Sequence, residues 1–237
     1  MKTIGLIGGL TWESTLEYYR IINKAVSERL GKLHSAKIIM YSFDFEEIVE
    51  PISEGAWDEV TNSMIAAAKQ VEGAGADFVL ICTNTIHKIA DEVAASISIP
   101  LLHIVDVTAE EIVSSGLKEV GLLGTKFTME QDFYKKRLNE KYDLGVVIPN
   151  KTDRETVHNI ILKELSLGQL KDSSREQIKM IIDRLSDSGA QGIILGCTEL
   201  PLLIKQQDSP IPIFDTTTIH SKAAVDYALK DQGDFNA

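Results

Sequence analysis

Short apolar runs alternate with amphipathic stretches along the chain. The run Thr3–Gly8 is apolar and ends in glycine, which is typical of a strand buried in a parallel sheet. Residues 59–72 carry apolar side chains at close to helical spacing, which predicts an amphipathic helix. Further strands are predicted at about 37–41, 77–82 and 100–105, and further helices at about 15–30, 88–93 and 218–230. Residues 43–54 are predicted to form an irregular acidic loop.

The second half of the chain repeats this pattern. Three landmarks recur in order at similar spacing: Gly5 and Gly121 are 116 residues apart, Cys82 and Cys197 are 115 apart, and Pro100 and Pro212 are 112 apart. Ordered matches of this kind indicate an internal duplication.

Strands that alternate with helices predict parallel sheets joined by right-handed crossovers. We therefore predict an α/β protein of two pseudo-symmetric lobes, each a roughly four-stranded parallel sheet flanked by helices, with the active site in the cleft between them. The first lobe is expected to comprise residues 1–106 plus the C-terminal helix 216–237, and the second lobe residues 107–215. The last residues, 231–237, are expected to fray.

Both cysteines of the chain stand where a predicted strand gives way to a predicted helix. Cys82 ends the third strand, and Cys197 follows the apolar run Ile193–Leu195. Ligands of parallel sheets bind beyond the carboxyl ends of the strands, so we expect both thiols to face the cleft from opposite sides. Backbone N–H groups and the helix dipole at such a junction are expected to lower the thiol pKa. One thiolate could then remove a proton from a carbon while the other thiol returns one to the opposite face, which inverts a stereocentre without a cofactor.

Polar residues surround both cysteines. Thr83, Asn84, Thr85 and Thr198 could bind a substrate or cap helices. Glu199 could bind an ammonium group or compensate a helix dipole. His87 could tune Cys82, touch the ligand or be structural, and Thr11 or Ser14 could cap the helix that ends near Gly31.

Composition and charge narrow the function classes. The chain has 24 basic and 35 acidic residues, a net charge of −11, which argues against nucleic acid or an anionic membrane surface as a partner. No apolar run approaches the roughly 18 residues that span a membrane, and the amino terminus has no signal-peptide layout, so a cytoplasmic location is expected. Two cysteines are too few for a disulfide scaffold or a four-thiolate zinc site. The sequence lacks the glycine spacing of a dinucleotide fingerprint. It also lacks a Walker A loop, an HExxH motif and a nucleophile elbow.

The ordered motifs resemble the aspartate/glutamate racemase family of cofactor-independent amino-acid racemases. Four segments carry the resemblance: Ile7–Thr15, Cys82–Thr85 with His87, Gly121–Thr125 with Thr128–Glu130, and Gly196–Glu199. The similarity covers nearly the whole chain. It implies two pseudo-symmetric lobes, Cys82 and Cys197 as the two acid/base residues, and neither pyridoxal phosphate nor a metal. It also implies a small amino acid as the partner molecule and a homodimer. The resemblance implies that Thr83, Asn84, Thr85 and Thr198 hold the amino acid. The full set of expected substrate-binding residues also includes Glu199, Leu10, Thr11 and His87.

One departure from the family pattern concerns the substrate side chain. Family members selective for aspartate place basic residues near its distal carboxylate. Here the loop Tyr41–Glu47 contains no arginine, and a second basic position falls near Ser166, with Lys163 close by. Burying an unpaired carboxylate beside Glu46 or Glu47 would be costly, which favours a broader or less acidic amino-acid range.

The same residues are compatible with other functions. A related enzyme could racemise hydantoins or decarboxylate malonates, although the latter would need only one thiol. A two-lobed protein that binds amino acids without exchanging the α-proton is a further alternative. A thiol redox switch is disfavoured because no C-x-x-C pair is present.

Overall fold

The computed structural model describes residues 1–230, and the predicted frayed tail lies outside the described residues. The described residues form two compact units: residues 1–104 together with residues 220–230, and Val105–Ile219. Each unit holds its own parallel sheet. The predicted lobe boundaries, residues 1–106 plus 216–237 and residues 107–215, stay a prediction. Across residues 1–230, no helix is long and apolar enough to cross a membrane.

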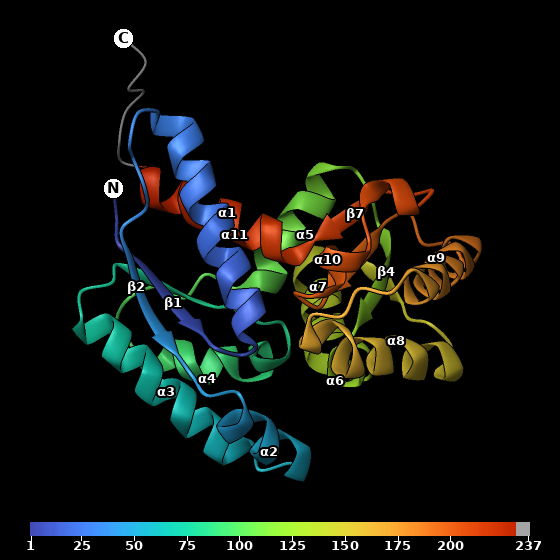
Figure 1. The fold of residues 1–237 in the computed structure, drawn as a ribbon, viewed down its shortest axis with the longest axis horizontal. Helices are drawn as coiled ribbons and strands as arrows, with labels where there is room; N and C mark the ends of the chain where they lie inside the picture. The colour runs from blue at the N-terminus through green and yellow to red at the C-terminus, as the bar shows by residue number, and fades with distance from the viewer. Residues whose placement is uncertain (231–237) are drawn as a thin grey trace. The chain divides into compact units, whose positions relative to one another are not determined.

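The first unit is built on a parallel sheet in the order β2–β1–β3. Its elements are β1 (Ile4–Gly8), α1 (Trp12–Leu30), β2 (Ile38–Ser42), α2 (Glu46–Glu54), α3 (Trp57–Gly73), β3 (Phe78–Ile81), the 3₁₀ turn η1 (Thr85–Ile89) and α4 (Ala90–Ala95). The central strand β1 is buried throughout, whereas the edge strand β2 is partly exposed. Figure 1 shows β1 and β2 alongside one another, as their parallel register requires. One buried cluster joins the sheet to α1 and to the last helix, α11 (Thr216–Leu229).

The second unit holds a four-stranded parallel sheet in the order β5–β4–β6–β7. Its elements are α5 (Ile104–Ser114), β4 (Glu119–Gly124), α6 (Lys126–Glu130), α7 (Asp132–Tyr142), β5 (Gly145–Val147), α8 (Lys151–Lys163), η2 (Leu165–Leu167), α9 (Asp172–Asp187), β6 (Ile193–Gly196), α10 (Leu200–Leu203), η3 (Gln206–Asp208) and β7 (Ile213–Asp215). The first residue of α5 belongs by contacts to the first unit, and α11 begins in the second unit and continues into the first. A cluster of buried aliphatic side chains from α8, α9, α10 and the sheet forms the core.

The two sheets share one topology. The order β2–β1–β3 of the first unit corresponds to β5–β4–β6 of the second, with β7 added at the edge. In each unit the first strand of the repeat is central and pairs in parallel with the next two strands. The prediction of an α/β protein with two similar parallel sheets is confirmed.

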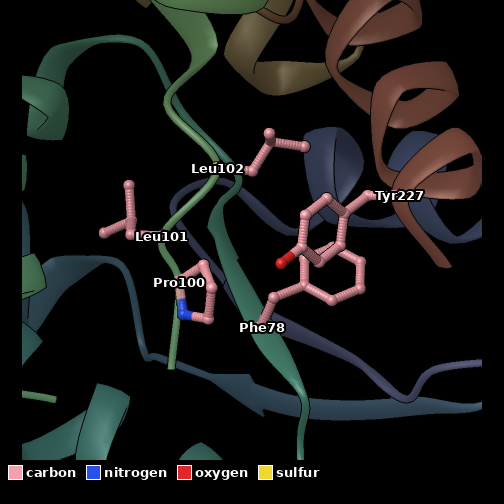
Figure 2. A pocket seen from close by; sticks show the side chains of 5 residues that line it. All are labelled: Phe78, Pro100, Leu101, Leu102 and Tyr227. Atoms are coloured by element: carbon pink, nitrogen blue, oxygen red, sulfur yellow. The ribbon is translucent and has the colours of Figure 1, made fainter. Parts of the chain in front are cut away.

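The predicted fourth strand of the first unit, residues 100–105, is wrong as a strand. Only Leu101 bridges Val79, through hydrogen bonds from Val79 N to Pro100 O and from Leu102 N to Val79 O, both 2.9 Å. Pro100 has no N–H with which to extend the ladder, and helix α5 begins at Ile104. Figure 2 shows this segment passing β3, with Phe78 and Tyr227 beside it.

The predicted irregular loop at 43–54 is also wrong in part, because Glu46–Glu54 forms α2. Pro51 lies inside the helix and cannot donate to the preceding turn. Ile48 and Ile52, one turn apart, are both buried. The burial of these two side chains compensates for the missing backbone hydrogen bond.

Gly9 makes the turn that leads from β1 into α1. Its φ is +77°, and a Cβ there would lie 2.2 Å from the carbonyl oxygen of Phe43. Phe43 N donates to Gly8 O at 3.0 Å, so the two loops are held together by backbone contacts. A side chain at residue 9 would therefore push apart the loops that follow β1 and β2.

We predict that Gly9→Ala destabilises the protein far more than Gly55→Ala. Gly55 has nearly the same φ, +76°, but nothing lies within 4 Å of its would-be Cβ. The control should cost roughly 1–2 kcal/mol for the left-handed backbone alone. Gly9→Ala should cost roughly 1–3 kcal/mol more because backbone atoms must move. Urea unfolding midpoints of the two variants test this, and equal midpoints would contradict the close approach.

Candidate active site

Cys82 directly follows the last residue of β3 and is held by two backbone hydrogen bonds. Its N–H donates to Ile7 O at 2.9 Å, and its carbonyl accepts from Ser14 Oγ at 3.0 Å. The first bond continues the β1–β3 pairing, and the second ties the cysteine to the start of α1. Cys82 is fully buried and belongs to the core cluster of the first unit.

The loop after β1 is tied to the same place. Thr11 caps α1, as predicted, by accepting from Ser14 N at 3.4 Å. Thr15 Oγ1 accepts from Gly9 N at 2.8 Å and donates to Thr11 O at 3.1 Å. Leu10 and Thr11 are both buried. The bonds through Ser14 therefore connect Thr11 to the backbone of Cys82, a link that the sequence analysis missed.

The segment after Cys82 is a 3₁₀ turn rather than the start of an α-helix. Asn84 and His87 are buried, while Thr83 and Thr85 are partly exposed. His87 Nε2 accepts from Ile104 N at 3.2 Å, so Nδ1 carries the proton and donates to Thr83 O at 2.7 Å. Both ring nitrogens thus hold backbone groups, which supports the structural interpretation of His87 over a direct catalytic one.

Two further histidines gather around His87. The ring centroids of His87 and His103 are 4.6 Å apart, and those of His87 and His220 are 5.9 Å apart. His220 Nε2 donates to Leu102 O, and Tyr18 Oη donates to His220 Nδ1, both at 2.8 Å. Burial lowers the pKa of His220 to about 4, so this ring is neutral at physiological pH. The long sequence separations of these residues gave no signal of the cluster.

Cys197 occupies the matching position in the second unit, directly after β6. Its Sγ donates to Glu199 Oε2 at 2.8 Å, and Thr198 Oγ1 donates to the same oxygen at 3.0 Å. All three side chains are buried. Glu199 therefore acts on Cys197 directly, in addition to any role towards a ligand.

The expected lowering of the thiol pKa values is wrong. Burial raises the pKa of Cys82 well above its usual range. Burial, followed by the charge of Glu199 and its hydrogen bond from the thiol, also raises the pKa of Cys197. Backbone N–H groups of Glu199 and Leu200 do lower the Cys197 pKa, as anticipated, but burial outweighs them. Both thiols are therefore protonated at neutral pH.

Two hollows on the surface hold neither cysteine. The pocket in Figure 2, lined by Phe78, Pro100, Leu101, Leu102 and Tyr227, has a volume of about 30 Å³, enough for water but not for an amino acid. A larger hollow of about 310 Å³ in the second unit contains the ion pair of Asp153 with Arg184, whose Nη2 and Asp153 Oδ1 are 2.8 Å apart. Asn150 Nδ2 also donates to Asp153, at 2.8 Å, so the Asp153 carboxylate in this hollow is already bound by the protein's own side chains.

Comparison with known proteins gives a consistent result. The chain is 51% identical to a protein from Yersinia pestis assigned as an Asp/Glu racemase, whose crystal structure matches over 97% of this chain and 100% of that one with a TM-score of 0.91. It is 41% identical to an aspartate racemase homologue from Pyrococcus horikoshii OT3, over 96% and 99% of the two chains, with a TM-score of 0.85.

A curated relative is the broad specificity amino-acid racemase RacX of Bacillus subtilis strain 168. It is 28% identical over 175 residues, which are 74% of this chain and 75% of RacX. The family model described as Asp/Glu/Hydantoin racemase matches residues 7–224, which include both cysteines and the segments on which the resemblance rests. The chain therefore belongs to the Asp/Glu/hydantoin racemase family.

Proposed function

We propose that this protein racemises amino acids through Cys82 and Cys197, one thiol acting on each face of the α-carbon. The observation that carries the proposal is the equivalence of the two positions. Each cysteine directly follows the strand that pairs with the first strand of its repeat, β3 beside β1 and β6 beside β4. Two matched acid/base groups suit a reaction that is symmetric about one carbon. Because both groups belong to the chain, we propose that proton transfer needs neither pyridoxal phosphate nor a metal.

The proton balance of the reaction is simple. A thiolate takes the α-proton, the second thiol donates its proton to the opposite face of the carbanionic intermediate, and the protein ends with the proton on the other sulfur. The active enzyme therefore carries one thiolate and one thiol. The raised pKa of both cysteines means that one thiol must lose its proton to solvent when the substrate binds, which leaves the thiolate in place. A substrate ammonium group near Glu199 would offset the negative charge that helps to raise the pKa of Cys197.

The remaining predicted site residues divide into two groups. Thr83, Asn84, Thr85 and Thr198 are proposed to hydrogen-bond the amino acid, because they adjoin the cysteines and carry neutral donors and acceptors. Leu10 and Thr11 are proposed to line the site from the loop after β1, and His87 to brace the turn after Cys82 through its bonds to Thr83 O and Ile104 N.

For the substrate, we propose a broad amino-acid range rather than a strict preference for aspartate. The loop Tyr41–Glu47 carries Asp44, Glu46 and Glu47 and no arginine. Ser166 Oγ donates to Ile161 O at 2.9 Å, so this side chain is occupied locally and offers no positive charge. An unpaired distal carboxylate would be repelled by the acidic loop. The similarity to a broad specificity racemase supports the same range.

The assembly and location also belong to the proposal. A homodimer in the cytoplasm is what the family resemblance and the reduced thiols suggest. Light scattering coupled to size-exclusion chromatography would measure the oligomeric state.

We predict that Cys82→Ser and Cys197→Ser each lower the racemisation rate by roughly 10²- to 10⁴-fold, the usual contribution of one general acid/base group. The measurement is the loss of optical rotation with a panel of L-amino acids that includes aspartate, glutamate, homoserine, methionine and lysine. Hydantoins serve as a second substrate class. Racemisation at close to the parental rate in either variant would refute the two-thiol mechanism. Circular dichroism confirms that each variant is folded.

Glu199→Gln should lower the pKa of Cys197, because it removes the charge and weakens the acceptor that favour the thiol over the thiolate. Iodoacetamide alkylates the thiolate form of cysteine, so the alkylation rate reports how much thiolate is present. In a Cys82→Ser background, the rate at Cys197 should begin to rise at lower pH in the Glu199→Gln variant than in the protein that keeps Glu199. The matched control measures alkylation of Cys82 in a Cys197→Ser background. There, Glu199→Gln should leave the pH dependence of the alkylation rate unchanged. A Cys197 profile that stays in place, or moves to higher pH, would refute this role of Glu199.

A further inference from the structure

One hydroxyl beside the Cys197 site is buried without a partner. Thr217 is 2% exposed, and among residues 1–230 its Oγ1 has no hydrogen-bond partner. Leaving a hydroxyl buried and unsatisfied costs about 1–3 kcal/mol. Native structures tolerate few such groups, and those that occur call for a specific reason.

Local structure explains why the protein itself supplies no acceptor. A threonine inside a helix usually donates to the carbonyl four residues earlier. Thr217 is the second residue of α11, so the residue four positions earlier is Ile213, which lies in the extended strand β7. The Thr217 hydroxyl therefore has no carbonyl of a preceding helical turn to which it could donate.

The polar side chains of the flanking residues are already hydrogen-bonded. Asp215 Oδ1 accepts from the N–H groups of Thr217 and Thr218, at 3.0 and 3.1 Å, and its Oδ2 accepts from Thr218 Oγ1 at 2.6 Å. Thr216 Oγ1 donates to Leu195 O at 2.8 Å. Of these three consecutive threonines, only Thr217 has a side chain with no partner among the described residues.

The strand register places Thr217 at the same sheet edge as Cys197. Leu195 in β6 pairs with Asp215 in β7. Cys197 and Thr217 each lie two residues beyond this pair. The bond from Thr216 to Leu195 keeps the two chain segments adjacent past the end of β7. This carboxyl edge is where parallel sheets bind ligands.

We propose that Thr217 Oγ1 contacts the substrate and donates a hydrogen bond to the α-carboxylate of the amino acid held at Cys197. This inference rests on the proposed racemase function. Glu199 already accepts from Cys197 and Thr198, and its charge favours the ammonium group of an amino acid over its carboxylate. The carboxylate needs donors instead, and Thr217 provides one. As the α-proton leaves, negative charge spreads onto the carboxylate, so this bond strengthens in the transition state.

Thr217→Val tests the proposal, since valine keeps the shape and removes the hydroxyl. We expect kcat/KM to fall about 10- to 100-fold, the usual effect of losing one hydrogen bond to a charged group. The melting temperature should stay the same or rise, because an unsatisfied polar group is removed. Thr217→Ser keeps the hydroxyl and should keep kcat/KM within a few-fold of the parent.

Ser221→Ala is the matched control. Ser221 lies one turn further along α11, is fully buried, and its Oγ likewise has no partner within residues 1–230. Its removal should leave kcat/KM unchanged, so a loss confined to Thr217→Val separates a substrate contact from a general effect on the helix.

Three results would overturn the proposal. One is parental kcat/KM in Thr217→Val, the second is an equal loss in the valine and serine variants, and the third is an equal loss in Ser221→Ala. Failure of the underlying function has a different signature: the parent protein itself would then racemise no amino acid in the panel, and the proposal would fall with it.

Discussion

The in-register pairing of parallel strands is the constraint on which the site depends. β3 follows β1 residue for residue up to Ile81, and the Cys82 N–H then donates to Ile7 O, one step further along the same ladder. β6 follows β4 in the same way up to Gly196. Each cysteine is the residue directly after its strand, so the hydrogen bonds of the sheet fix the position of the cysteine backbone. The loops around Gly9 and Thr11 are then fastened to Cys82 through Ser14. A rigid sheet therefore positions groups that sit on turns.

Burial governs the chemistry of both thiols. Water is excluded around Cys82 and Cys197, so the neutral thiol is favoured and the pKa of each is raised. For Cys197 the carboxylate of Glu199 acts in the same direction. Neutral thiols are protected from oxidation and alkylation, because the thiolate is the reactive form. On this account the amino acid, a zwitterion with its own positive charge, brings the field that activates the base.

The sequence predicted the features that depend on local chemistry. The repeated strand–turn–helix pattern predicted the two parallel sheets and the positions of both cysteines at strand ends. It also predicted Gly31 as the end of α1, and of the two cap candidates Thr11 and Ser14 the structure has Thr11. The predictions were wrong where contacts between residues far apart in the sequence determine the structure. Residues 43–54 were expected to form an irregular acidic loop, yet Glu46–Glu54 is helical and buries Ile48 and Ile52. The direction of the thiol pKa shift depends on how deeply each sulfur is buried. A local sequence motif does not predict this burial.

Other features of the site required three-dimensional contacts altogether. His103 and His220 lie far apart in the sequence and yet both pack against His87. The partnerless hydroxyl of Thr217 is visible only when every neighbouring donor and acceptor has been assigned. By contrast, the absence of arginine between Tyr41 and Glu47, on which the proposed substrate range rests, is visible in the sequence alone.

The most direct test of two-sided proton transfer follows the origin of the α-hydrogen. A single enantiomer of a turned-over amino acid is incubated in D₂O with the reduced protein, and both enantiomers are separated early in the reaction and examined by NMR. Two thiols acting on opposite faces predict that the newly formed enantiomer carries deuterium while the remaining starting enantiomer still carries protium. A new enantiomer that retains the substrate's own proton would show that one base serves both faces, and would contradict the account.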